Sequence, residues 1–381
     1  MNFDLTEEHK RIREMTRKFA NEYILPRAEE MERTGEYPYD IIESMGEMGM
    51  MGTPFCEEYG GRGGDWVGMH LCIEEISRGD PPLGGLLDVN TSVVGQELYV
   101  FGTEEQKKKW LVPIAEGKQI GAFGLTEPDA GSDPGAMRTT ALLDGNEWVL
   151  SGTKQFITNI GLENALVVLV TAITERREEG NNVISAFIVP KDAPGFQLGK
   201  RYEKMAWKAS ATHEIILEDC KIPKENLLGN PSRGFSQHLS VLETGRISIG
   251  AIATGLAQAC LELGLSFVRR GYPSRKSLHQ SQTVPFKLAD FAIMIELSRM
   301  MYLKAAWFKD QGRKHTLEAH FAKLFASEMA TKIAGEVLRM HGLYGSLDEC
   351  PISRYFKGAK LLEIVEGTSE IQRMVISREI I

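Results

Sequence analysis

The chain has 381 residues, of which 43% are hydrophobic and 25% are charged, and its formal net charge is −8. This composition is typical of a globular protein with two or three domains, and it excludes a disordered chain or a small disulfide-rich scaffold. The excess of acidic residues also disfavours a positive surface for nucleic acid, so we expect no nucleic-acid partner.

Residues 1–8 contain no basic segment followed by an apolar run, so no signal peptide is predicted. The longest apolar stretch, 247–268, is interrupted by a polar residue at every fourth position of its second half. This pattern predicts a helix buried in a bundle and no membrane span. The five cysteines are scattered without a C-x-x-C pair, which is typical of reduced thiols in the cytoplasm. The eight histidines show no spacing that predicts a metal site.

Residues 1–120 are predicted to form an N-terminal helical domain. Thr6 is a candidate N-cap followed by two acidic residues, and residues 103–106 fit a capping box. The glycine-rich segment 60–64 does not follow an apolar strand. We therefore interpret it as a connector and not as a phosphate-binding loop.

Residues 121–231 change to short strand-like runs separated by turn residues, which predicts an antiparallel β domain. Asp144-Gly145-Asn146 is typical of a hairpin turn. The expected strands cover residues 139–143, 147–150, 165–172, 183–189 and 214–217.

Residues 232–381 return to helical periodicity, with long helices expected over 235–270, 284–310 and 316–341. The predicted fold class is therefore α+β, with an N-terminal helical domain, a central antiparallel β domain and a C-terminal helical bundle. No long flexible linker separates the three parts, so we expect them to pack against one another.

Two segments carry an unusual density of polar groups. Residues 124–133 combine hydroxyls, carboxylates and glycines, which suits either a loop that binds a polar ligand or an ordinary turn. In 365–372, a capping box from Ser369 to Gln372 predicts the start of a last helix. Glu366 precedes this helix among apolar residues. Desolvation could raise its pKa to suit a general base, although the residues alone favour a surface glutamate near a helix start.

These two segments resemble motifs of the acyl-CoA dehydrogenase family of flavoproteins, and the resemblance covers essentially the whole chain. The motifs that carry it are residues 124–136, Lys154 to Asn159 with Phe156 in place of the usual tryptophan, residues 225–229, Glu243-x-x-Arg246, and Glu366-Gly367-Thr368. The resemblance implies the same three-part fold, usually as a homotetramer. It also implies non-covalent FAD bound between the β domain and the C-terminal bundle.

The resemblance implies roles for individual side chains. Residues expected to contact FAD are Phe123, Leu125, Thr126, Ser132, Phe156, Thr158, Thr368 and Glu370. Ser132 would also face the pantetheine arm of the substrate, and Arg246 and Gly367 are the other expected substrate contacts. Among the FAD contacts, Phe156 would pack on the flavin ring and Thr158 would hydrogen-bond near flavin N5.

By the same resemblance, Glu366 would remove the α-proton of an acyl-CoA thioester while the β-hydrogen leaves as hydride to flavin N5. The flavin ribityl hydroxyl and the backbone N–H of Glu366 would stabilise the developing enolate. Electrons would then pass to an electron-transfer flavoprotein. Some relatives place the base just before the residue matching Arg246. That residue is Gly245 here, which cannot act as a base and which would leave room for a bulky acyl ring.

The first departure from the family pattern concerns an arginine that reaches the FAD pyrophosphate of a neighbouring subunit. Aligned on Gln282, which is itself an expected FAD contact, the segment 271–275 lacks this arginine at its usual place. We hypothesise that Arg275 or Arg339 supplies the missing positive charge.

The second departure is Asp88, which stands where relatives mostly have a small residue in a helix lining the acyl pocket. One interpretation is an aspartate on the helix surface. The other is a second acid–base group, as in relatives that desaturate alicyclic carboxyl-CoA esters. The second interpretation favours a cyclic or branched acyl group, such as cyclohexane- or cyclohexene-carboxyl-CoA.

The predicted function is therefore an FAD-dependent acyl-CoA dehydrogenase with Glu366 and Asp88 as candidate catalytic residues. Two alternatives stay open. One is an enoyl-CoA reductase that runs the same chemistry backwards within an electron-bifurcating complex. The other is a non-catalytic acyl-CoA-binding scaffold that has lost its flavin.

Overall fold

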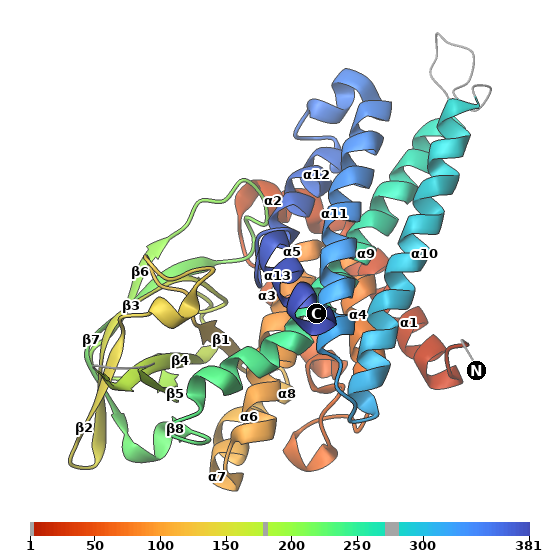
Figure 1. The fold of residues 1–381 in the computed structure, drawn as a ribbon. Coiled ribbons are helices and arrows are strands. Elements are labelled where there is room, and N and C mark those ends of the chain that lie inside the picture. The colour runs from red at the N-terminus through yellow and green to blue at the C-terminus, as the bar shows by residue number, and fades with distance from the viewer. Residues whose placement is uncertain (1–3, 178–181, 271–281) are drawn as a thin grey trace.

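The computed structural model describes residues 4–177, 182–270 and 282–381, which form a three-part molecule (Figure 1). The β domain stands at one side of two helical domains that pack closely against each other. The helical domains meet along α4 (Trp66–Gly79), all of whose residues are buried. The α+β class and the order of the three parts agree with the prediction.

The N-terminal domain consists of short helices that surround α4. Thr6 caps the first of them by accepting a hydrogen bond from the backbone N–H of His9, and Thr103 and Gln106 form a capping box. Both predicted caps are confirmed. Besides α4, this domain contains α1 (Glu7–Phe19), α2 (Ala28–Thr34), α3 (Tyr39–Glu47), α5 (Pro81–Leu87), η5 (Asp88–Gly95), α6 (Gln96–Phe101), α7 (Glu104–Gln106) and α8 (Val112–Ala115).

The β domain is a sheet in the order β6-β7-β3-β2-β4-β5-β8, with β1 also paired to β4. Its strands are β1 (Ile120–Gly124), β2 (Thr140–Asp144), β3 (Glu147–Thr158), β4 (Ala165–Glu175), β5 (Val183–Pro190), β6 (Phe196–Arg201), β7 (Thr212–Pro223) and β8 (Leu227–Leu228). The predicted hairpin turn joins β2 to β3, with Gly145 at φ 61°.

The sheet differs from the prediction in three ways. Strands β1, β6 and β8 were not expected, β3 and β7 are longer than expected, and β1 runs parallel to β4. Two of the five residues of β1 are glycines, which weaken a strand pattern, and β6 carries no buried residue that would reveal an alternation. Tertiary pairing therefore decides both strands.

The C-terminal domain is a helical bundle of α9 (Gly234–Arg270), α10 (Thr283–Asp310), α11 (Thr316–His341), α12 (Pro351–Leu362) and α13 (Ser369–Ile380). The three long helices agree with the expected ranges within one residue at each end. By length and composition, α9 could cross a membrane, but 67% of its most apolar window is buried inside the protein. Its polar residue Thr254 is used within the bundle, where its hydroxyl lies 2.8 Å from that of Ser298.

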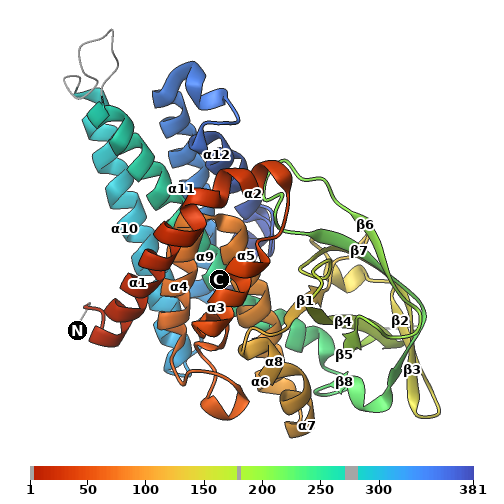
Figure 2. The same cartoon turned by 180° about the vertical axis from the view of Figure 1, so that it is seen from behind.

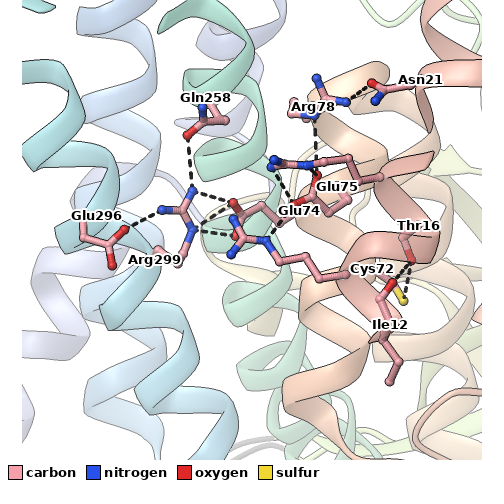
Figure 3. Close-up of polar contacts among 12 residues, drawn as sticks. Ile12, Thr16, Asn21, Cys72, Glu74, Glu75, Arg78, Gln258, Glu296 and Arg299 are labelled. Carbon is pink, nitrogen blue, oxygen red and sulfur yellow. Dashed lines mark hydrogen bonds and ion pairs between the residues drawn. The ribbon is translucent and has the colours of Figure 1, made fainter. Parts of the chain in front are cut away.

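An ion-pair network joins the N-terminal helices to the bundle (Figure 3). Glu74 and Glu75 are buried neighbours on α4. Figure 2 shows this helix from behind, beside α1. Glu75 accepts hydrogen bonds from Arg17 on α1, whereas Glu74 accepts from Arg299 Nη2 at 2.7 Å and from the Tyr302 hydroxyl on α10. Burial alone would raise the pKa of Glu74, but the charge of Arg299 together with the hydrogen bonds from Arg299 and Tyr302 outweighs burial and lowers the pKa. Glu74 is therefore ionised in the interior.

Candidate active site

Glu366 lies in the short loop that connects α12 to α13. Its backbone has a φ of 53°, a left-handed conformation that is strained for a residue with a side chain, and Gly367 follows at φ 92°. The N-cap of α13 is Thr368, whose hydroxyl accepts from the N–H of Ile371. The predicted capping box that begins at Ser369 is therefore wrong by one residue, because Ser369 already has helical backbone geometry.

The carboxylate of Glu366 lies against Gly245 on α9. A Cβ atom added at Gly245 would lie 2.3 Å from Glu366 Oε2, so a larger residue here would displace the carboxylate from this position. Room for a bulky acyl ring beside Gly245 stays a prediction.

Asp88 is 1% exposed at the start of η5, so the interpretation as a helix-surface aspartate is wrong. Among the described residues, Asp88 Oδ1 and Glu366 Oε2 are buried without a hydrogen-bond partner. Burial raises the pKa of Asp88 well above its ordinary value, and the negative charge of Glu366 raises it further. Burial also raises the pKa of Glu366, whereas the charges of Arg246 and Lys323 act in the opposite direction. The pair therefore favours a proton on Asp88 over a proton on Glu366.

Arg246 follows Gly245 on α9 and is buried close to this pair. Its Nη1 lies 3.3 Å from Nε2 of His320 on α11. Burial and the charge of Arg246 lower the pKa of His320 to about 4, so its imidazole is neutral and accepts the hydrogen bond. Arg246 thus supplies a fixed positive charge near Glu366. Its contact with substrate stays a prediction.

The loop after β1 is fixed to β3 by a buried ion pair. The Glu127 carboxylate accepts from Lys154 Nζ at 2.7 Å and from the backbone N–H groups of Arg138 and Thr139. Lys154 also donates to the carbonyl of Leu125 at 3.3 Å, and its side chain is fully buried. This ion pair therefore sets the position of the loop that carries several of the expected flavin contacts.

Replacing Lys154 with methionine is expected to weaken FAD retention by about tenfold or more. The change leaves the buried Glu127 carboxylate without its cation, and uncompensated buried charges typically cost ~3–5 kcal/mol. The flavin-to-protein absorbance ratio after gel filtration measures the effect. Lys221→Met, at an exposed position of β7, is the matched control. Full FAD retention in Lys154→Met would show that the ion pair does not organise the cofactor loop.

Phe156 on β3 presents an unusual apolar surface. Its φ is 59° and its side chain is 59% exposed, with the ring centroid 4.7 Å from that of Tyr202. A strained backbone that holds an aromatic ring toward solvent is typical of a binding surface. Thr158 ends the same strand half-buried, and Ser132 is exposed on the neighbouring loop. An apolar ring with hydroxyls nearby fits a flavin, whose ring is planar and has a polar edge.

Phe123 connects β1 to the C-terminal bundle. Its ring is stacked on His238 of α9, with the centroids 4.3 Å apart. His238 Nδ1 lies 2.6 Å from Oε1 of Glu97, and both side chains are fully buried. The sequence analysis missed this pair, since no local pattern links two polar residues that lie so far apart in the chain.

The remaining predicted cofactor residues are distributed over the bundle. Thr368 caps α13, Glu370 is exposed in its first turn, and Gln282 is exposed at the start of α10. Arg275 lies outside the described residues. Arg339 is exposed near the end of α11 and pairs with a neighbouring glutamate, about 24 Å along the helix from Lys323.

Two polar residues that were not expected to do so hold the Glu366 loop. Lys323 Nζ donates to the carbonyl of Gly367 at 2.7 Å, and Gln372 Nε2 donates to the same carbonyl at 2.8 Å. The sequence does indicate that Lys323 is buried, because this lysine shares a helix face with alanines, and the structure buries all of them. These are Ala319, Ala322, Ala326 and Ala330.

A carboxylate in a helical bundle, with a buried oxygen and set beside a β domain that exposes an aromatic ring, fits a class of flavin-dependent enzymes. Models of the acyl-CoA dehydrogenase N-terminal, middle and C-terminal domains match residues 6–118, 122–220 and 232–381. The chain belongs to the acyl-CoA dehydrogenase family, whose members are FAD-dependent oxidoreductases.

Known relatives match over the full chain. The protein is 47% identical over 381 residues to the probable acyl-CoA dehydrogenase YngJ of Bacillus subtilis (strain 168), and 40% identical over 380 residues to the short-chain specific acyl-CoA dehydrogenase of Clostridium acetobutylicum. Each match covers 100% of both chains. A solved structure described as the electron transferring flavoprotein of Acidaminococcus fermentans has a TM-score of 0.97 at 40% identity and covers 100% of both chains.

Proposed function

We propose that this acyl-CoA dehydrogenase uses Glu366 to remove the α-proton of its thioester substrate and so forms an enoyl-CoA. The observation that carries this proposal is the carboxylate itself, which has one buried oxygen without a partner and lies against Gly245. FAD, when bound, accepts the β-hydrogen as hydride. After the proton transfer Glu366 is neutral, which suits its buried position.

The other residues of the site stabilise the reacting groups. The backbone N–H of Glu366 would donate to the thioester carbonyl and stabilise the enolate as an oxyanion hole does. Arg246 provides a positive charge near the same point. Phe123, Leu125, Thr126, Ser132, Phe156, Thr158, Thr368 and Glu370 are the residues that we propose to hold FAD. For Arg339 we propose a contact with FAD bound by a second subunit, because it lies far from Lys323 and the base loop of its own chain.

A short acyl group is the substrate class that we propose, since a relative at 40% identity over the full chain is named as short-chain specific. The cyclic or branched acyl group keeps the support of Asp88, which is buried beside the base. Anaerobic mixing of the holoenzyme with straight, branched and alicyclic acyl-CoA esters tests both classes, because a substrate bleaches the flavin absorbance. Bleaching by none of them would contradict the proposed function.

Replacing Asp88 with asparagine is expected to separate the two substrate classes. Asparagine keeps the size of the side chain but holds no transferable proton. Flavin reduction by butyryl-CoA should stay within about tenfold of the parent rate. Reduction by cyclohexene-carboxyl-CoA should be lost, because an acid–base role of Asp88 would contribute ~10²–10⁴-fold to the rate. Stopped-flow absorbance and proton exchange at the β and γ carbons measure both effects. Asp290→Asn, on an exposed face of α10, is the control. Equal turnover and exchange in parent and variant would remove Asp88 from the mechanism.

A second candidate function is an enoyl-CoA reductase in an electron-bifurcating complex. The structural match to the Acidaminococcus fermentans protein, described in a study of flavin-based electron bifurcation, favours it. An electron-transfer flavoprotein is the proposed redox partner in either direction. Stable co-purification with both subunits of that flavoprotein would favour the reductase. A non-catalytic scaffold is disfavoured, because two buried carboxyls are costly and binding alone does not require them.

We also propose that the chain forms a homotetramer. One face of α10 exposes large apolar side chains at helical spacing, which are Phe286, Ile293, Leu297, Met300 and Trp307. Apolar surfaces of this kind mark subunit interfaces, and a second copy of the chain would cover them. A cytoplasmic location is proposed on the basis of five free cysteines.

A further inference from the structure

Lys323 occupies an unusual position for a lysine. Its side chain is fully buried on α11, and its Nζ donates to two carbonyls, of Gly367 at 2.7 Å and of Glu363 at 3.4 Å. Within the described parts of the chain, no carboxylate lies within ion-pairing distance of its Nζ. Two backbone carbonyls are thus its direct partners, and both belong to the loop that carries Glu366.

Packing alone does not account for this residue. Burial lowers the pKa of Lys323 to about 8, which shows how poorly the interior tolerates its charge, even though the negative charge of Glu366 acts in the opposite direction. Burying an ammonium group without an ion-pair partner costs free energy, whereas burying methionine or leucine at the same position does not. The cost is therefore offset by a function of the amine.

The loop needs an anchor because it is strained. Glu366 and Gly367 both have positive φ, and a residue with a side chain in this region costs ~1–3 kcal/mol. The carbonyls of Glu363 and Gly367 lie at the two ends of the strained segment, and Lys323 binds both. Gln372 Nε2 supports the second carbonyl, and the N–H of Ser369 supports the first.

The anchoring fixes the direction of the base. With the Gly367 carbonyl turned toward Lys323, the carboxylate of Glu366 is turned toward Gly245. The positive charge of Lys323 also stabilises the ionised form of Glu366 over the protonated form. Geometry and charge thus act on the same carboxylate.

We propose that Lys323 is a positioning residue of the dehydrogenation reaction, whose ammonium group holds the strained loop so that Glu366 is directed at the α-carbon of the thioester. This inference rests on the proposed role of Glu366 as the base.

The test compares Lys323→Met with the parent holoenzyme. Methionine keeps the length of the side chain and removes the donors and the charge. A base displaced by ~1 Å reacts about 10²-fold more slowly, so flavin reduction by butyryl-CoA should fall by about 100-fold with FAD retained. The isotope effect of α-deuterated butyryl-CoA should increase, because proton removal becomes slower relative to the other steps. Lys332→Met, at an exposed position of the same helix, is the matched control and should react at the parent rate.

Several outcomes would overturn the proposal. One is a Lys323→Met rate within threefold of the parent. Another is a lower rate that follows a lower melting temperature while the isotope effect is unchanged, since that indicates a merely structural role. If Lys323→Met gives no soluble holoenzyme, Lys323→Gln replaces it in the test, because glutamine keeps a neutral donor. Its rate of flavin reduction should fall by less than 100-fold, with the same increase in isotope effect. A parental rate and a parental isotope effect in Lys323→Gln would overturn the proposal. Failure of the proposed function is distinct, because the parent enzyme itself would then not be bleached by acyl-CoA.

Discussion

Replacing Glu366 with glutamine is expected to lower the rate of flavin reduction by ~10⁴-fold, the upper range for loss of a general base. Glutamine has nearly the same shape, so FAD and the acyl-CoA ester should still bind. It cannot accept the α-proton, and the raised pKa of the neighbouring Asp88 favours the protonated form of that carboxyl, which cannot replace the base. Stopped-flow measurement of flavin absorbance under anaerobic conditions determines the rate.

The control is Glu363→Gln, which makes the same chemical change in the same loop. Its side chain pairs with Lys360 at 2.7 Å, while its carbonyl, which binds Lys323, is unchanged. The parent rate should rise with pH through the raised pKa of Glu366, because only the ionised form takes the proton. A Glu366→Gln variant that reduced flavin at the parent rate would end the assignment of this residue as the base.

Replacing Arg299 with leucine is expected to destabilise the protein by ~3–5 kcal/mol, because it leaves the buried carboxylate of Glu74 without its cation. Arg299 donates to Glu74 through Nη2 and Nε, and 2% of the Glu74 side chain is exposed. The network of Figure 3 ties α4 to α10, so the interface between the helical domains should weaken first. Urea denaturation followed by circular dichroism measures the free energy of unfolding.

Two further variants make this prediction specific. Arg33→Leu removes an exposed arginine that lies 3.9 Å from Glu30, and it should cost less than ~1 kcal/mol. The double variant Glu74→Leu/Arg299→Leu removes both charges and should recover much of the loss, since no buried charge is left unpaired. If Arg299→Leu is no less stable than Arg33→Leu, the network does not hold the domains together.

The contribution of Glu74 should also depend on pH in one direction. Its pKa in the folded protein lies below the ordinary value of 4.5, so the unfolded chain takes up a proton first as pH falls. The stability from this ion pair is therefore complete well above pH 4.5 and is lost as pH falls through the folded pKa.

The long helices and the chemical motifs could be predicted from the sequence for a local reason. A helix such as α11 repeats its buried residues every three or four positions, and Thr6 caps a helix through a bond to a residue three positions away. Strands β1 and β6 escaped prediction because glycines or exposure removed the alternation, and only pairing with distant strands defines them.

By itself, the sequence determined the α+β class, the order of the three parts, the family and the identity of Glu366 as the candidate base. Only the tertiary structure decided that Asp88 is buried beside Glu366, that the Glu366 carboxylate lies against Gly245 and that Lys323 holds the Glu366 loop. The physical reason is that periodicity tells which face of a helix is buried but not which residue lies opposite. Those contacts depend on how η5, α9 and α11 pack together around the loop before α13.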